Sequence, residues 1–234
     1  MLNLFLLIIF LISAYGVSII FNKLFFLNPK KTLLEDFFSG TYIIILISLI
    51  FNFFFPLKFL SYLIVIVGII LFCKNLKNLN FNFFGLLLII SILYYISLSN
   101  GLAVDSKVYH LQLIEKFSSN KIIFGFSNLD FKYGNVSIWH LMLSTFYYDL
   151  NEIKIINYIN ITLFSILIYE CFRKINDIKI ESLFLIFSVF YLILYSVIHP
   201  SGNGTILTLL GSPDADFPGM ILFIISVYFY LLSF

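Results

Sequence analysis

The sequence predicts an all-α protein: a polytopic bundle of transmembrane helices, with short interfacial helices in the segment 100–154. Hydrophobic residues make up 61% of the chain and the mean hydropathy is +1.05, whereas soluble globular proteins are about 45–50% apolar. Charged residues contribute only 11%, too few to cover a water-soluble surface. The apolar runs lack period-two alternation, which argues against a transmembrane β-barrel. The length leaves room for about seven spans of roughly 20 residues each and for no sizeable soluble domain.

Each apolar run is expected to be a helix, because backbone polar groups within lipid must be paired inside their own segment. The first run lacks a basic flank and a cleavage site, so it is interpreted as a retained span and not as a signal peptide. The second and third runs meet at Pro56, which cannot continue a helix, so they predict a tight hairpin. The seven runs are 2–21, 41–56, 58–73, 83–99, 155–172, 181–198 and 217–234.

The basic residues of the short loops predict the orientation. Cytoplasmic loops are rich in Lys and Arg, which places loops 22–40, 74–82 and 173–180 inside the cell and the N-terminus outside. Loops 100–154 and 199–216 are then expected to share the outer face, because two spans lie between them. The basic residues on the inner side are Lys23, Lys30, Lys31, Lys74, Lys77, Arg173, Lys174 and Lys179.

Composition also bounds the compartment and the partners. The abundance of Ile, Phe, Asn and Lys is typical of an AT-rich bacterial coding sequence, so we expect a multi-pass protein of the bacterial inner membrane. A net charge of +2 gives no reason to expect a nucleic acid, and membrane lipids are the expected surroundings. We interpret residues 1–234 as a single membrane domain. The apolar run that reaches Phe234 suggests the N-terminal part of a longer protein.

Polar residues gather first in loop 100–154. Asp105 is expected to cap a helix over 106–118, in which Tyr109 shares its face and His110 lies next to that face. A second interfacial helix is expected over 137–149, with the only tryptophan, Trp139, at headgroup depth. As alternatives, Asp105 is only a helix cap, and the imidazoles of His110 and His140 only pack at the interface.

A second polar cluster precedes the last apolar run. Asp214 and Asp216 form a DxD pattern, which can hold a divalent cation between oxygen ligands. The alternative is that both aspartates are solvated caps. Ionisable residues near a bilayer suggest function by default, but Glu170 and Arg173 are three residues apart and are expected to form a structural ion pair.

Three stretches together resemble a group of polytopic bacterial membrane proteins that are similar to family 39-like glycosyltransferases of the GT-C class, which accompany surface-polysaccharide genes. The resembling patterns are D-x-x-x-Y-H-L-Q at 105–112, P-G-L-x-N-L at 124–129 and R-x-x-F-N-S-x-W at 132–139. A fourth, S-P-x-P-D-x-P, is similar to 212–218 and aligns the family aspartate with Asp216. The chain departs from the patterns at Phe124, Lys132 and Gly134, where the family has Pro, Arg and Phe.

The resemblance implies transfer of a sugar from a polyprenyl-phosphate-linked donor. A carboxylate in an early external loop then acts as general base on an acceptor hydroxyl, or ligates a metal on the phosphate. On this basis Asp105 and His110 are the candidate catalytic residues, and Asp216, with Asp214, is the candidate metal ligand for a divalent cation. The candidate substrate-binding residues are Tyr109, Asn128, Lys132, Asn135 and Trp139.

Two other functions remain open on the sequence alone. One is a transporter or flippase of a lipid-linked glycan, although none of the seven runs has a central charge of the kind that ion-coupled carriers use. The other is an inactive, truncated remnant. If a shared active site exists, the carboxylates of Asp105 and Asp216 are expected within roughly 10 Å of each other, so that one substrate can touch both.

Overall fold

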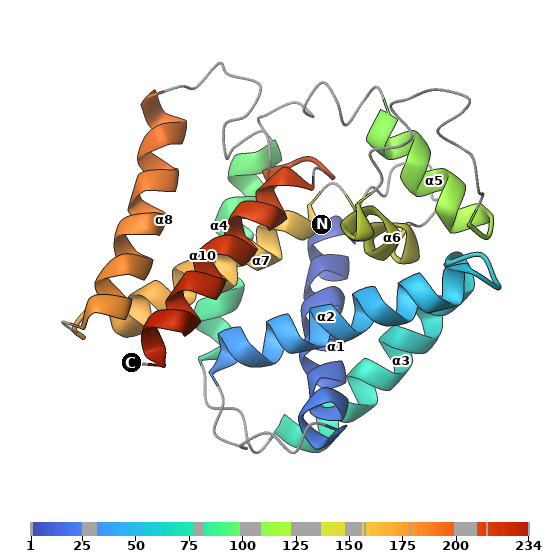
Figure 1. Cartoon of the computed structure of the whole chain (residues 1–234), viewed down its shortest axis with the longest axis horizontal. Helices are drawn as coiled ribbons and strands as arrows, with labels where there is room; N and C mark the ends of the chain where they lie inside the picture. The colour runs from blue at the N-terminus through green and yellow to red at the C-terminus, as the bar shows by residue number, and fades with distance from the viewer. Residues whose placement is uncertain are drawn as a thin grey trace.

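The computed structural model is all-helical in the part of the chain that it describes, with no strand there (Figure 1). The described residues are 2–24, 32–76, 82–98, 109–122, 137–147, 156, 158–177, 179–198, 210–213 and 215–233. Their helices are α1 (Leu2–Leu24), α2 (Leu33–Asn52), α3 (Lys58–Asn75), α4 (Phe83–Leu98), α5 (Leu111–Ser119), α6 (Ile138–Thr145), α7 (Ile159–Lys174), α8 (Ile180–Ile198) and α10 (Asp216–Leu232).

Three helices, α1, α2 and α3, are long and apolar enough to cross a membrane. Shorter apolar helical stretches of 10–17 residues lie at Phe83–Leu98 (α4), Ile180–Leu194 (within α8) and Asp216–Leu232 (α10). Large apolar side chains such as Phe54, Phe84 and Phe223 are more than two-thirds exposed, as expected of helices whose outer surface meets lipid rather than water. The chain is therefore helical and membrane-associated.

Helix α2 begins at Leu33, well before the apolar run that starts near residue 41. Thr32 and Glu35 form a capping box: the Thr32 backbone N–H donates to Glu35 Oε2 at 2.7 Å, and the Glu35 backbone N–H donates to Thr32 Oγ1 at 3.2 Å. This arrangement satisfies two backbone donors that a helix start leaves unpaired. The polar first turn thus belongs to the helix, and not to a loop over 22–40.

Helix α1 packs backbone-to-backbone against its two neighbours through glycines. A Cβ at Gly16 would collide with the Gly68 carbonyl of α3, and a Cβ at Gly40 of α2 would collide with the Ala14 carbonyl. A Cβ at Gly68 would lie 2.6 Å from Ser13 Cα. Small residues at such crossings let membrane helices approach closely, so that van der Waals contact holds them together.

The remaining long helices set up two ends of the bundle. At one end, uppermost in Figure 1, the last turn of α4 lies beside the start of α7, where the Tyr94 and Tyr158 rings are 5.1 Å apart. At the opposite end the Asn82 backbone N–H, just before α4, donates to the Tyr169 hydroxyl of α7 at 2.7 Å. Helices α5 and α6 lie at the first of these ends, which we call the loop end.

The two helices expected in loop 100–154 are present but shorter than predicted. The first is helical from Tyr109, and its regular α-helical part, α5, runs from Leu111 to Ser119. Residues 101–108, including the expected cap Asp105, lie outside the described residues. The second, α6, ends at Thr145 and not near 149. Beyond it, Phe146 packs edge-to-face on Phe10 with ring centroids 5.0 Å apart.

Candidate functional site

Helix α5 is fastened to the tip of the α2–α3 hairpin. The amide Nδ2 of Asn52, a residue with no exposed surface, donates to the carbonyls of Phe117 at 3.3 Å and Asn120 at 3.1 Å. Main-chain bonds run both ways: Leu57 N–H donates to the Phe117 carbonyl, and Ile122 N–H donates to the Asn52 carbonyl. Since α5 follows directly after His110, these bonds also fix the place of that imidazole.

His110 stacks on a second histidine. Its ring centroid lies 4.4 Å from that of His140 on α6, with 31° between the two planes. The Tyr109 ring also packs on His110, with the ring centroids 4.2 Å apart. His110 is 6% exposed and His140 only 1%. The two imidazoles thus form a buried stack that joins α5 to α6.

The His140 ring is held in one orientation by its own helix. Its Nδ1 accepts from the Ser137 backbone N–H at 3.3 Å, within the capping box that begins α6. A neutral ring must then carry its proton on Nε2. Burial, followed by the charge on His110, lowers the pKa of His140 to about 3, although the Pro213 backbone acts in the opposite direction. His140 is therefore neutral at physiological pH.

Residues 210–213, which precede α10, pack into the same end. Asn160 Nδ2 at the start of α7 donates to the Ser212 carbonyl at 2.9 Å, and a Cβ at Gly211 would contact the Ser97 carbonyl of α4 at 3.5 Å. Pro213 is buried and its backbone interacts with the His140 ring. The described parts of loops 100–154 and 199–216 therefore meet at the loop end.

The other predicted site residues divide into described and undescribed ones. Trp139 is 4% exposed, so it packs inside the protein and not at an exposed headgroup position. Asp216 is exposed at the first position of α10. Because Asp105 is not described, the predicted approach of the Asp105 and Asp216 carboxylates lies outside the described residues, as do Asn128, Lys132, Asn135 and Asp214.

Two residues of this site were not among the sequence candidates. For His140 the sequence leaves both interfacial packing and catalysis open, and it places the residue with Trp139 on the helix expected over 137–149. It gives no signal for the contact with His110, which comes from a separate helical segment. Asn52 is a lone amide at the end of an apolar run, a pattern that favours a buried hydrogen-bonding role. Among the described residues, no group of three His, Cys, Asp or Glu side chains is placed to hold a metal ion.

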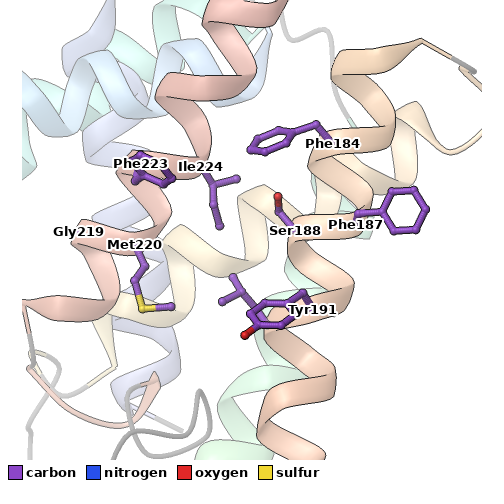
Figure 2. Close-up of a pocket in the computed structure, with 9 residues that line it drawn as sticks. Phe184, Phe187, Ser188, Tyr191, Gly219, Met220, Phe223 and Ile224 are labelled. Atoms are coloured by element: carbon purple, nitrogen blue, oxygen red, sulfur yellow. The ribbon is translucent and has the colours of Figure 1, made fainter.

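A groove of about 700 Å³ lies between α8 and α10 (Figure 2). Its walls are almost wholly apolar, and Ser188 and Tyr191 supply the only hydroxyl groups among the lining side chains. In Figure 2 the rings of Phe184 and Tyr191 and the side chain of Ile224 face the space between the two helices. The groove therefore suits a hydrocarbon chain better than a polar molecule.

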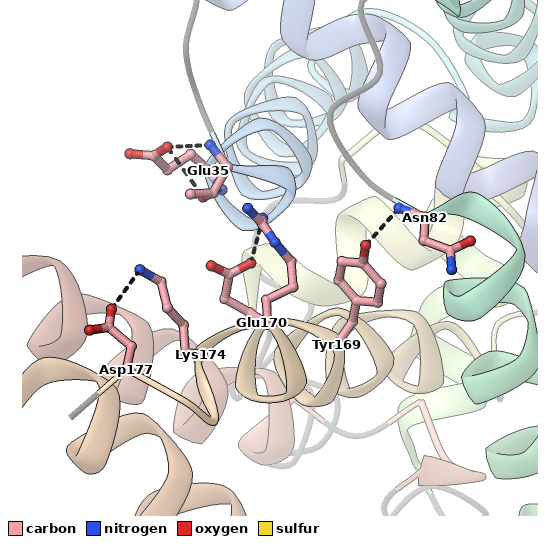
Figure 3. A network of polar contacts seen from close by, with 8 residues as sticks. Glu35, Asn82, Tyr169, Glu170, Lys174 and Asp177 are labelled. Carbon is pink, nitrogen blue, oxygen red and sulfur yellow. Dashed lines mark hydrogen bonds and ion pairs between the residues drawn. The ribbon is translucent and has the colours of Figure 1, made fainter. Parts of the chain in front are cut away.

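Polar contacts gather again at the end opposite the loop end (Figure 3). Glu170, which has no exposed side-chain surface, accepts from Arg173 Nη1 at 3.1 Å, as the spacing predicted. Lys174 and Asp177 form a second pair at 3.4 Å. Because only the Glu170 carboxylate is buried, removing the partly exposed Arg173 would leave a buried charge without its partner. The pair therefore constrains the end of α7.

Comparison with known proteins gives one match. A protein-family model described as "Domain of unknown function (DUF8201)" matches residues 1–234. No curated protein and no solved structure matches the chain.

Proposed function

The chain belongs to this family of domains of unknown function. From the resemblance of its loop segments to glycosyltransferase patterns, we propose that it is a GT-C-like membrane glycosyltransferase. Its donor is a polyprenyl-phosphate-linked sugar and its role is cell-surface glycan assembly. We place it in the bacterial inner membrane as a multi-pass protein of seven spans, formed by α1–α4, α7, α8 and α10. The basic residues gather in every second connection between these helices, which supports that arrangement.

One observation carries the proposal. The segments that resemble the glycosyltransferase patterns come from two loops far apart in sequence, yet His110, Trp139, His140 and Pro213 lie together at the loop end. Packing alone does not require polar groups from both loops to gather in one buried place. A shared substrate site does require it.

The proposed roles follow from the chemistry of each side chain. Asp105 acts as general base on the acceptor hydroxyl, with His110 bordering the same space. Asp216, assisted by Asp214, holds a divalent cation or a sugar hydroxyl, and Lys132 neutralises the leaving phosphate. Tyr109, Asn128 and Asn135 contact the donor, and the buried Trp139 supports them from inside the protein.

The apolar groove between α8 and α10 could bind the polyprenyl chain of the donor. Polyprenyl chains are hydrocarbon, and the lining offers little that a polar ligand could use. Helix α10 runs from this groove to its first residue, Asp216, at the loop end. A lipid chain lying along α10 would therefore carry its phosphate toward the proposed catalytic groups.

The test is transfer of radiolabelled sugar from a panel of polyprenyl-phosphate sugars by the purified chain in lipid vesicles. We expect Asp105→Asn to reduce transfer by at least about 100-fold, since it keeps a helix-capping group and removes the base. Glu115→Gln is the matched control, because it also neutralises a carboxylate of loop 100–154, at an exposed position of α5. Full transfer by Asp105→Asn would exclude the proposed base.

A transporter or flippase of lipid-linked glycans is the second candidate. The observation that favours it is the Glu170 carboxylate, which is fully buried near the end of α7 and pairs with the partly exposed Arg173, because ionisable groups within membrane bundles often mark transport pathways. Vesicles that move a fluorescent lipid-linked sugar between leaflets without consuming it would support this candidate over the transferase.

A further inference from the structure

His140 has no part in the proposed mechanism. Its ring makes three contacts with three different parts of the loop end: the Ser137 backbone at the start of α6, the His110 ring before α5, and the Pro213 backbone before α10. With 1% exposure it has little access to solvent. A residue with such contacts is placed to act on other groups and not on a substrate.

The chemistry of the ring matches that placement. Because Nδ1 accepts from Ser137, the proton of the neutral ring is on Nε2, which has no partner of ordinary hydrogen-bond geometry among the described residues. The Pro213 backbone carbonyl is a weak acceptor for this Nε2–H. Burying a donor with so poor an acceptor is costly, so the place of the ring reflects its contacts with Ser137 and His110. A cationic ring here would also repel a protonated His110.

We propose that His140 is a positioning residue: a neutral imidazole, fixed in its Nε2–H form, that keeps the His110 ring and the Pro213 backbone at one separation. It thereby holds the segment that leads to Asp216 against the segment that carries His110. The inference rests on the proposed function for its consequence in catalysis, but not for the state of the ring itself.

Two substitutions of His140 separate the stacking on His110 from the polar contacts of the ring nitrogens. His140→Phe keeps a ring that can stack on His110 and removes both nitrogens. His140→Gln keeps a polar amide near the Nε2 position and removes the stacking ring. The matched control is Thr145→Val, on the same helix and equally buried, which removes a hydroxyl that bonds Ser48 at 2.8 Å and the Leu141 carbonyl at 3.3 Å.

In the transfer assay, both His140 variants are expected to lose about 10- to 100-fold in kcat, because small misplacements of reacting groups have effects of this size. Their Tm should fall no further than that of Thr145→Val. If either variant keeps its kcat within twofold of the wild type, or if Thr145→Val loses kcat equally, His140 has no positioning role.

A second measurement does not depend on transfer. The chain has three histidines, so ¹⁵N spectra of selectively labelled protein can be assigned by single substitution. His140 is expected to show a protonated Nε2 and an unprotonated Nδ1 without titration from pH 5.5 to 8. The His110 signals should shift in both His140 variants and stay unchanged in Thr145→Val.

A titrating His140, a proton on Nδ1, or unmoved His110 signals would overturn the inference. If these spectra agree with it while no sugar donor is consumed, the proposed function fails and the positioning contact stands. If transfer proceeds but the spectra disagree, the reverse holds.

Discussion

Asn52 shows how much one amide can determine at the residue scale. It ends α2, is completely buried, and bonds two carbonyls that are 65 and 68 residues further along the chain. Each bond of this kind contributes about 1 kcal/mol net. The end of α5, and with it the position of His110, therefore depends on a side chain that lies outside the predicted site.

Replacing Asn52 with Ala should destabilise the protein by about 1–2 kcal/mol, because the Phe117 and Asn120 carbonyls lose their amide donor, although Phe117 keeps the Leu57 N–H. Thermal unfolding in detergent measures the loss, and faster hydrogen exchange in α5 locates it. The control is Asn120→Ala, where an exposed amide bonds only its own helix end, and a change within about 0.5 kcal/mol is expected. Equal effects in both variants would contradict the role given to Asn52.

His140 predicts how the protein responds to acid. Its pKa is about 3 in the folded chain against 6.5 for a free histidine, so the unfolded chain binds the proton first. The stability that the neutral ring contributes is thus complete above pH 6.5 and is lost as pH falls toward 3. We expect a loss of up to about 1 kcal/mol per pH unit between pH 6 and 4.

Unfolding measured across that range in His140→Phe should show a shallower acid dependence than in the wild type. His110→Phe, which removes the neighbouring charge, serves as the comparison. An unchanged slope in His140→Phe would mean that other groups govern acid unfolding.

At the element scale, the crossing of α1 with α2 and α3 depends on three glycines. Backbone atoms stand where a Cβ would go at Gly16 and Gly40, and backbone cannot move aside as a flexible side chain can. Gly16→Ala should therefore cost at least about 2 kcal/mol, since overpacking in a close crossing typically costs about 1–3 kcal/mol.

Gly219→Ala on α10 is the matched control, because nothing lies within 4 Å of a Cβ at that position. There the better helix propensity of Ala should leave stability unchanged or raise it by up to about 1 kcal/mol. Thermal unfolding in the same detergent compares the two, and comparable destabilisation would show that the crossing is not tight.

Most of the helices could be predicted, because an apolar run in a bilayer can pair all of its backbone polar groups only as a helix. Their ends were harder to predict. The start of α2 was placed too late since Glu35 and Asp36 interrupt the apolar run, although the Thr32-x-x-Glu35 spacing is a capping signature. The end of α6 depends on packing between Phe146 and α1, which no local pattern contains.

The candidate site also has a part that the sequence predicts and a part that it does not. His110 and Trp139 were named from the sequence and lie at the loop end. The stack of His110 on His140 could not be predicted, because the two residues lie on separate helices and their contact arises only when α5 packs on α6. Whether Asp105 joins Asp216 remains a prediction.

At the scale of the whole molecule, the two ends of the bundle predict opposite membrane faces. Ser119 on α5 is exposed near the loop end, and Lys179 is exposed at the turn between α7 and α8. The Ser118 side chain, by contrast, is 3% exposed and unsuited to labelling. These positions allow a direct test of orientation.

In a background without Cys73 and Cys171, we expect cysteines at Ser119 and Asn203 to react with an impermeant reagent from outside the cell. A cysteine at Lys179 should react only after the cells are opened, because the short basic loops face the cytoplasm. Reaction of Ser119 and Asn203 from different sides would refute the arrangement of the spans.

The bond between the α2–α3 tip and α5 also has a consequence for biosynthesis. Leu57 N–H and the Asn52 carbonyl leave the ribosome long before Phe117 and Ile122, their partners. While the nascent chain is being inserted, the hairpin tip must be hydrated, because its final partners do not yet exist. A translational pause late enough for α5 to have left the ribosome would give the tip time to dock before the later spans arrive, whereas a nascent chain released before α5 would keep an open hairpin.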